Sequence, residues 1–388
     1  MTKQDILKIL PIAGAIAGDI IGSSYELKGN RTKDYNFTLF NNNSTYTDDT
    51  VLTIAVANWL LDTSIPLQLI VRSICRKYME VGYGHSFKKW LFSSEPEPYQ
   101  SWGNGSAMRV SPIVLKTPSL KDALQVAEET AIITHNHSEG IKGAKAVTAA
   151  IFLARHGFTK VNIKDYIENK FGYNLSRDIN TIRTNYSFDS SCQGSVPEAI
   201  IAFLQSSDFE DAIRLAVSLG GDADTQACIA GSIAASFYDE IPDNILDFVF
   251  NKLPEDFIDI LHKFIDSLIY GSQSAVILTA KEDLFLNSYI RYTFALAVTD
   301  STKVFIPKGT RVYVEIKDRK CSMTQVLSNR EQIFSRIENE LKNKFPDFTS
   351  EYPYLCNGIL LDIDFDMYNS FYISEVSDDD IFNLFNIQ

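Results

Sequence analysis

Two short acidic stretches, far apart in the chain, place the strongest constraint on how it folds. Thr47-Asp48-Asp49-Thr50 and Gly220-Gly221-Asp222-Ala223-Asp224-Thr225 each place two carboxylates and a threonine hydroxyl where an apolar run of helical character begins. A helix needs only one side-chain oxygen to cap the free N–H groups of its first turn. Each stretch alone is consistent with an ordinary capped helix, but the surplus of acids in both favours a shared chemical role.

If the two helix starts converge, they bring together four carboxylates and two hydroxyls. Oxygen ligands of this kind suit hard divalent cations such as Mg²⁺, Mn²⁺ or Ca²⁺. They are enough for a two-metal site that still leaves room for water and a substrate. The partial positive charge and free amides of helix N-termini also favour an anionic ligand such as a phosphate.

The composition is that of a folded, acidic chain. Its 388 residues, 45% hydrophobic and 22% charged, are enough for a sizeable core and for two domains. The net charge of −13 argues against binding to nucleic acid or anionic membranes, although a local basic pocket stays open as an alternative. The apolar run from Ile6 to Ile21 is broken by Lys8, Pro11 and Asp19, so it does not predict a membrane span. Five scattered cysteines without a CxxC pair indicate free thiols, and the expected location is cytoplasmic.

Helical periodicity dominates the first 270 residues, which contain no pattern typical of a sheet. The expected helices cover residues 12–21, 50–61, 66–81, 120–133, 138–155, 162–170, 195–205, 208–219, 225–238 and 244–269. Ser195 is expected to cap its helix, with Pro197 in the first turn. Gly14, Gly18 and Gly22 recur at every fourth position of the first helix, so a neighbouring helix can approach it closely.

Two more acids lie on or just after that first helix. Asp19 falls within the apolar run, where a buried carboxylate needs a partner or a metal. Hydrogen bonds to nearby backbone or hydroxyl groups are the favoured interpretation. Glu26 follows where the helix must end, and it could face either a site or the solvent.

A glycine-containing segment, Ser101 to Arg109, is a candidate for binding an anion. Gly103 and Gly105 allow a close backbone approach, and a helical run from about Ser106 could point its amides at a phosphate. A plain turn would have the same sequence. The nearby His135 and His137 could suggest a metal site, but without a third histidine or cysteine a turn between helices is favoured.

The chain changes character after about residue 270. Branched and aromatic residues predict strands at 275–279, 292–298, 311–316 and 358–364, and helices are expected at 323–344 and 377–385. This pattern predicts a separate, smaller α+β domain over residues 271–388. No motif in it carries recognisable chemistry.

Taken together, the motifs of the first part resemble those of the ADP-ribosylglycohydrolase family, over roughly residues 10–265. The family's Gly-Asp-x-x-Gly helix is matched at 18–22, its Thr-Asp-Asp-Thr motif at 47–50 and its GNG-x-A-M-R loop at 103–109. Its Thr-His pair is matched at Thr134-His135. The usual GGDTDT appears as GGDADT at 220–225, with Ala223 replacing a threonine that is not a customary ligand.

The resemblance implies a compact all-α catalytic domain over residues 1–270, whereas the α+β domain that follows has no counterpart in simple members of the family. It also implies two bound Mg²⁺ or Mn²⁺ ions. The implied metal ligands are Thr47, Asp48, Asp49, Asp222, Asp224 and Thr225.

The implied reaction is hydrolysis of the glycosidic bond between ADP-ribose and a modified protein side chain or a small acceptor. Asp49 would activate the attacking water, and Glu26 would close over the bond or assist proton transfer. The implied substrate contacts are Gly103, Asn104, Gly105, Ser106, Met108 and His135, with residues 103–106 around the diphosphate.

Two other functions compete with this one. A non-catalytic relative that binds ADP-ribose or blocks an ADP-ribosyltransferase would be marked by lost acidic ligands, and none is lost. A different two-metal hydrolase, such as a phosphoesterase, would be expected to have histidine among its ligands, whereas these motifs offer only carboxylates and hydroxyls. The segment Asp189 to Gly194 departs from the aromatic loop expected for adenosine contact, and the domain after residue 270 could select a protein partner.

Overall fold

A computed structural model of the chain describes residues 1–270, apart from 28 and 118, and beyond them seven strands between residues 275 and 376. The chain divides into two compact units. We call residues 1–155 and 163–265 the helical unit, and residues 156–162 and 266–388 the second unit.

Residues 1–270 form helices joined by turns, and the described part of this range contains no strand. The α-helices are α1 (Lys3–Lys8), α2 (Leu10–Glu26), α3 (Asp48–Trp59), α4 (Leu67–Cys75), α5 (His85–Phe92), α6 (Leu120–Ile132), α7 (Ser138–Arg155), α8 (Lys160–Phe171), α9 (Ile179–Asn185), α10 (Cys192–Gln205), α11 (Phe209–Val217), α12 (Ala223–Tyr238), α13 (Asp243–Phe250) and α14 (Glu255–Tyr270). Two short 3-10 turns lie at Asn104–Ser106 and Ile113–Leu115. The prediction of a helical fold without a sheet is therefore confirmed for this part of the chain. None of the described helices is both long and apolar enough to cross a membrane.

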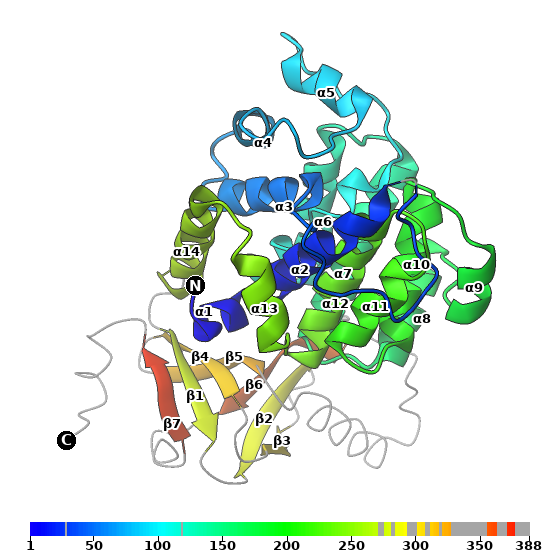
Figure 1. The fold of residues 1–388 in the computed structure, drawn as a ribbon. Helices are drawn as coiled ribbons and strands as arrows, with labels where there is room; N and C mark the ends of the chain where they lie inside the picture. The colour runs from blue at the N-terminus through cyan, green and yellow to red at the C-terminus, as the bar shows by residue number, and fades with distance from the viewer. Residues whose placement is uncertain are drawn as a thin grey trace. The chain divides into compact units, whose positions relative to one another are not determined.

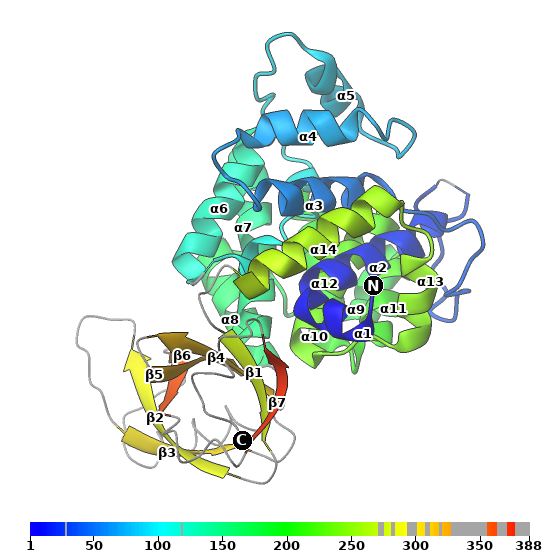
Figure 2. The same ribbon diagram turned by 90° about the vertical axis from the view of Figure 1, so that its left-hand side faces the viewer.

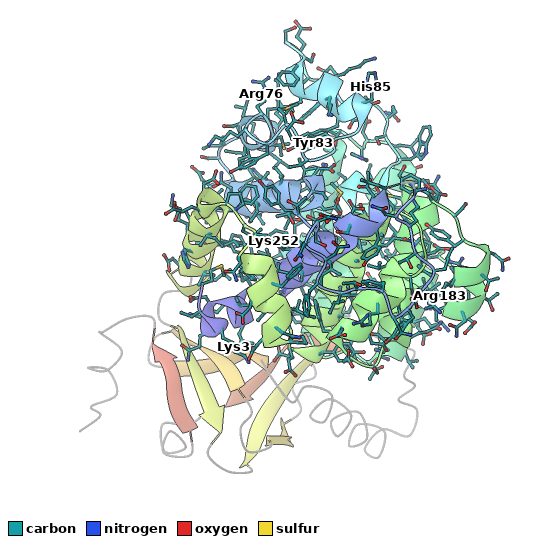
Figure 3. All side chains as sticks on the ribbon, viewed as in Figure 1. Lys3, Arg76, Tyr83, His85, Arg183 and Lys252 are labelled. Atoms are coloured by element: carbon teal, nitrogen blue, oxygen red, sulfur yellow. The ribbon has the colours of Figure 1, made fainter. Side chains whose placement is uncertain are left out.

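The helix expected at 66–81 is too long, because α4 ends at Cys75 and a turn with a positive φ at Gly82 follows. The helix α5 comes next and was not predicted. It buries Phe87, Trp90 and Leu91. Arg76 Nη2 donates to the carbonyl oxygen of Leu91 at 2.7 Å, which ties α4 to the last turn of α5. In both views these two helices lie at one end of the helical unit, and Arg76 and His85 are labelled there (Figure 1, Figure 2, Figure 3).

The start of α10 also differs from the prediction. Ser191, not Ser195, caps this helix, because its hydroxyl accepts a hydrogen bond from the Gly194 N–H at 3.1 Å. Ser195 lies inside the helix, where its hydroxyl donates to the carbonyl oxygen of Ser191 at 2.7 Å. Pro197 is therefore an interior residue of the helix. The capping prediction failed because both serines have the sequence context of a cap.

The glycines of α2 bring this helix into close contact with α12. A Cβ atom at Gly14 would lie 2.3 Å from the Gly231 carbonyl oxygen, and one at Gly18 would lie 2.0 Å from that of Ala227. At Gly22 the corresponding distance to the Ala223 carbonyl oxygen is 2.4 Å. Because the partners run backwards along the chain, α2 and α12 are antiparallel and lie side by side (Figure 1). The end of α2 therefore meets the start of α12, which carries the second acidic stretch.

The second unit contains a sheet whose strands pair in antiparallel fashion, in the order β3-β2-β6-β5-β4-β1-β7. The strands are β1 (Ala275–Ala280), β2 (Leu284–Tyr292), β3 (Ser301–Ile306), β4 (Arg311–Lys317), β5 (Lys320–Val326), β6 (Leu355–Asp362) and β7 (Phe371–Val376). The runs expected at 275–279 and 311–316 fall in β1 and β4, and most of the run expected at 358–364 falls in β6. Tyr292 ends β2, and the rest of the strand expected at 292–298 lies outside the described residues. Met323 lies in β5 and not in the expected helix, while residues 327–344 and 377–385 also lie outside the described part.

Candidate metal centre

Asp19 connects α2 to the first acidic stretch. Its Oδ2 accepts hydrogen bonds from the backbone N–H groups of Thr47 and Thr50, both at 3.0 Å, and another from the Thr50 hydroxyl. Its Oδ1 accepts from the Thr47 hydroxyl at 2.7 Å. The expectation that this buried carboxylate bonds to backbone and hydroxyl groups is confirmed. These bonds also fix where α3 begins relative to α2.

Thr47 is the N-cap of α3, and two hydrogen bonds orient its hydroxyl. Its hydroxyl donates to Asp19 and accepts from the Asp49 N–H at 3.3 Å. A hydroxyl oxygen has two lone pairs, so one remains for a cation. The prediction that this acidic stretch opens a helix is confirmed, and Asp19 accounts for the direction of the threonine hydroxyl.

A hydrogen bond links the two acidic stretches directly. The Thr225 hydroxyl donates to Asp49 Oδ2 at 3.2 Å. The other carboxylate oxygen, Asp49 Oδ1, is buried and has no hydrogen-bond partner among the described residues. An unpaired buried carboxylate oxygen is costly, and a cation or a proton would satisfy it.

The carboxylates gather into two groups that share one residue. Oxygens of Asp19, Asp49 and Asp224 lie within 4.8 Å of one another, and so do oxygens of Glu26, Asp222 and Asp224. Since Asp224 belongs to both, the groups are adjacent. Asp48 is partly exposed and belongs to neither group, but the charges of Asp19, Glu26 and Asp222 act on it. Each group consists of oxygen ligands alone, the donor type preferred by Mg²⁺ and Mn²⁺.

Crowding of acids in a buried site makes their charged forms unfavourable. Asp48 keeps some solvent exposure, but the protein packed around its carboxyl, followed by the neighbouring Asp19, raises its pKa to about 8. Burial raises the pKa of Asp19 and of Asp222 to about 6. For Asp49 and Asp224 burial and neighbouring carboxylates raise the pKa well above its ordinary value. A divalent cation would reverse this effect, because its charge favours the ionised carboxylates.

Asn104 joins the glycine segment to the acids. Its side-chain Nδ2 donates to Asp222 Oδ2 at 2.7 Å and to the Ser195 hydroxyl at 3.1 Å. Its backbone N–H donates to the Ser190 carbonyl oxygen at 2.8 Å, beside a bridge that pairs Gly103 with Ser191. These bonds hold the glycine segment next to the acid groups.

The rest of the glycine segment does not form an α-helix. The helical run expected from about Ser106 is wrong, since a 3-10 turn of three residues ends there. The Ser106 hydroxyl instead donates to the Gly140 carbonyl oxygen at 2.7 Å, which ties the turn to α7. Met108 continues toward the acids, where its sulfur lies 3.9 Å from the Thr225 hydroxyl.

His135 lies against the two glycines of the segment. A Cβ atom at Gly105 would lie 3.2 Å from His135 Nε2, and one at Gly103 would lie 3.5 Å from it. The histidine is buried, and it belongs to the turn that connects α6 to α7, as expected. His137 Nδ1 accepts from the Glu139 N–H at 3.1 Å, and neither acid group among the described residues includes a histidine.

Arg31 and Phe188 are neighbours of the site that the sequence did not single out. The Arg31 guanidinium lies 4.0 Å from the centre of the Phe188 ring, and its Nε donates to the Glu26 carbonyl oxygen at 2.8 Å. Burial raises the pKa of Glu26, and the Arg31 charge partly opposes this. Phe188 directly precedes the segment that lacks an aromatic residue. The position of Phe188 near the site is evident only from its contact with Arg31, which is far from it in the sequence.

Comparison with known proteins identifies the family of the chain. The ADP-ribosylglycohydrolase family model matches residues 12–273. The chain is 28% identical over 315 residues to ADP-ribosylhydrolase ARH3 of Homo sapiens, covering 60% of this chain and 86% of that protein. It is 26% identical over 301 residues to the same-named protein of Xenopus tropicalis, covering 59% and 86%. A solved structure, an ADP-ribosylglycohydrolase-related protein complex, shares the fold with a TM-score of 0.52 at 22% identity, covering 68% of this chain and 99% of that one. The chain belongs to the ADP-ribosylglycohydrolase family.

Proposed function

We propose that the helical unit is a metal-dependent hydrolase that releases ADP-ribose from a modified protein side chain or a small acceptor. The observation that carries this proposal is the pair of acid groups sharing Asp224, held by Asn104 beside Gly103, Gly105 and His135. An acid cluster alone would fit many cation-binding proteins. Its position next to a glycine segment adds a place for the diphosphate of ADP-ribose.

The residues fit two Mg²⁺ or Mn²⁺ ions. The unpartnered Asp49 Oδ1 and the oxygen-only groups around Asp224 support this assignment. The residues that would hold the ions are Thr47, Asp48, Asp49, Asp222, Asp224 and Thr225, with Asp19 and Glu26 adjoining. When bound, the ions would act as Lewis acids toward oxygens of the substrate and of water.

Asp49 is suited to take a proton from the attacking water. Thr225 uses one lone-pair site of Asp49 Oδ2, so the carboxylate keeps other sites for a cation and for a proton taken from water. The water would then attack the anomeric carbon of the ribose, where positive charge develops in the transition state.

Glu26 is suited to the leaving-group side. It is half-buried at the end of α2, and its carboxylate lies within 4.8 Å of those of Asp222 and Asp224. Burial raises the pKa of Glu26, so it holds a proton more readily than an exposed glutamate. Glu26 would donate that proton to the departing acceptor or close over the bond.

The glycine segment and His135 would bind the diphosphate. Without side chains at Gly103 and Gly105, phosphate oxygens can approach the backbone and His135 Nε2. Asn104, Ser106 and Met108 would line the same binding region. Asn104 is held there by its bond to Asp222, Ser106 by its bond to α7, and Met108 by its contact with Thr225.

The test is release of ADP-ribose from a panel of substrates. ADP-ribosyl-arginine and ADP-ribosyl-serine are incubated with the full chain, with Mg²⁺ or Mn²⁺ and with EDTA. We expect release from at least one substrate, abolished by EDTA and reduced at least about 100-fold in the isosteric variant Asp49→Asn. Asp247→Asn, on the exposed side of α13, is the matched control and should keep full activity.

Other outcomes separate the competing functions. Binding of ADP-ribose without release from any substrate would indicate a non-catalytic binding protein or one that blocks a transferase. Release that persists unchanged in Asp49→Asn would contradict the assigned role of this residue. A protein substrate that is processed only by the chain with residues 271–388 would assign partner selection to the second unit.

A further inference from the structure

Arg109 is a buried cation that the proposed chemistry does not use. It is the last residue of the glycine segment's motif and is fully buried. Its Nη2 donates to the Thr130 carbonyl oxygen at 2.6 Å and to the Thr134 hydroxyl at 3.0 Å, while Nε and Nη1 have no partner. The described residues provide no carboxylate to pair with it. Leaving a guanidinium unpaired in a protein interior is costly, so its presence here calls for a specific role.

The bond from Arg109 decides the direction of the next one. A guanidinium has no acceptor, so Arg109 must be the donor and the Thr134 oxygen must accept. The single hydroxyl hydrogen of Thr134 is then free to point at His135 Nδ1, which lies 2.7 Å away. No other acceptor for that hydrogen is present among the described residues. A neutral His135 that accepts at Nδ1 satisfies this buried hydrogen, which would otherwise have no partner, so we assign Nδ1 as the acceptor.

A histidine that accepts at Nδ1 carries its proton on Nε2 when the ring is neutral. Burial and the nearby Arg109 charge hold the pKa of His135 well below its ordinary value, which keeps the ring neutral. Nε2 is also the atom that faces Gly103 and Gly105. The arrangement thus presents an N–H donor to the side of the glycine segment where no side chain intervenes.

We propose that Arg109 is a positioning residue, acting through Thr134, that holds His135 in the tautomer whose Nε2–H donates to the diphosphate of ADP-ribose. This inference rests on the proposed function and adds a device to it. Arg109 itself does not touch the ligand. The lack of a carboxylate partner is consistent with this role, because a paired acid would cancel the positive field behind His135.

The test compares two substitutions at Thr134 that leave Arg109 in place. Thr134→Val removes the hydroxyl at nearly constant shape, and Thr134→Ser keeps it. In the ligand-free chain, ¹⁵N resonances of the five histidines are recorded, and that of His135 is assigned with His135→Gln. We expect unprotonated Nδ1 and protonated Nε2 in the wild type and in Thr134→Ser, and a change in Thr134→Val.

Affinity for free ADP-ribose, measured by calorimetry in the presence of Mg²⁺, gives the second readout. We expect Thr134→Val to bind about tenfold more weakly and Thr134→Ser to bind within about twofold of the wild type, as the loss or rescue of one hydrogen bond to a charged group implies. Arg109→Lys keeps the positive charge but loses the forked donors of the guanidinium. Once thermal unfolding has shown that this variant folds, it should resemble Thr134→Val in both readouts. A purely structural role would lower the melting temperature while leaving the ¹⁵N shifts and the affinity unchanged.

Two results would overturn the inference: a protonated Nδ1 in the wild type, or equal ADP-ribose affinity in Thr134→Val and wild type. Failure of the proposed function gives a different result. In that case the wild type binds no ADP-ribose at all, while the ligand-free ¹⁵N shifts still report whether Arg109 and Thr134 set the tautomer.

Discussion

The Thr225 hydroxyl donates to Asp49 Oδ2 at 3.2 Å and joins residues that are 176 positions apart in the chain. This bond places the start of α12 against the start of α3. Because the same carboxylate leaves its other oxygen unpartnered, Thr225 orients Asp49 without saturating it. The two acidic stretches thus lie against each other in the folded chain.

The first prediction concerns this bond. Thr225→Val removes both the donor to Asp49 and a candidate ligand oxygen at nearly constant volume, whereas Thr225→Ser keeps both. We expect Thr225→Val to bind Mn²⁺ about 10- to 100-fold more weakly and Thr225→Ser to stay close to the wild type. Calorimetric titration of the EDTA-stripped protein measures this, and equal affinities in the two variants would show that the hydroxyl does not support the site.

The second prediction concerns pH. In the folded, metal-free protein the pKa of Asp48 is raised to about 8 and that of Asp222 to about 6. An unfolded carboxyl titrates near pH 4. The folded state therefore binds more protons than the unfolded state between about pH 4 and 8, so these groups contribute less stability as the pH rises through that window.

Cations compete with these protons, so their effect on stability has the opposite trend. We expect the rise in melting temperature caused by a fixed Mg²⁺ concentration to be small near about pH 5.5 and larger near about pH 8. Each displaced proton changes the free energy of unfolding by about 1.4 kcal/mol for each step of one in pH. For a folded domain as large as the helical unit, this is a shift of roughly 3–6 °C in melting temperature. Thermal unfolding with Mg²⁺ and with EDTA at both pH values measures it, and an increment that does not depend on pH would rule out the proton competition.

Part of the fold was predictable because local patterns determine it. The spacing of Gly14, Gly18 and Gly22 predicted that some helix approaches α2 closely. It could not indicate that α12 is that helix, because the matching small residues, Ala227 and Gly231, look like ordinary helix residues in sequence. The boundaries of α4 and α10 were misplaced for a related reason: caps and tertiary contacts, and not periodicity, determine where those helices end or begin.

The site was predictable where residue type alone demands a chemical explanation. Two acids and a threonine at each helix start predicted a shared oxygen-rich centre, and the structure brings Asp49 and Thr225 together. Asp19 remained ambiguous because its partners lie 28 and 31 residues away. The stacking of Arg31 on Phe188 could not be predicted, since neither residue stands in a pattern that points to the other.

The third prediction tests the glycine contact between α2 and α12. A Cβ atom at Gly18 would lie 2.0 Å from the Ala227 carbonyl oxygen, which is backbone and cannot move aside cheaply. We expect Gly18→Ala to lower the free energy of unfolding by about 3 kcal/mol, the upper end of what overpacking of a core usually costs, and to weaken cation binding by displacing α12. Denaturant unfolding followed by circular dichroism measures the change.

The matched control for that variant is Gly84→Ala. A Cβ atom at Gly84 would meet nothing within 4 Å, so this substitution should change the free energy of unfolding by no more than about 0.5 kcal/mol. Equal stabilities of the Gly18 and Gly84 variants would mean that α2 and α12 can separate at no cost, which would remove the explanation of how the two acidic stretches meet.

The last prediction concerns Asn104, which connects the glycine segment to the acids. Its Nδ2 donates to Asp222 Oδ2 at 2.7 Å, and this bond lowers the pKa of Asp222 against the effect of burial. Asn104→Leu removes the donor at similar volume, so the pKa of Asp222 should rise above about 6 and protons should compete better with the cation.

We therefore expect Asn104→Leu to weaken Mn²⁺ binding about 10- to 100-fold at neutral pH, with partial recovery as the pH is raised. Asn58→Leu, at a partly exposed position of α3, is the control and should bind as the wild type does. Calorimetric titrations at about pH 7 and pH 8.5 distinguish the cause, because lost charge balance recovers with pH whereas a collapsed loop does not. A variant with wild-type affinity at both pH values would show that Asp222 needs no partner from the glycine segment.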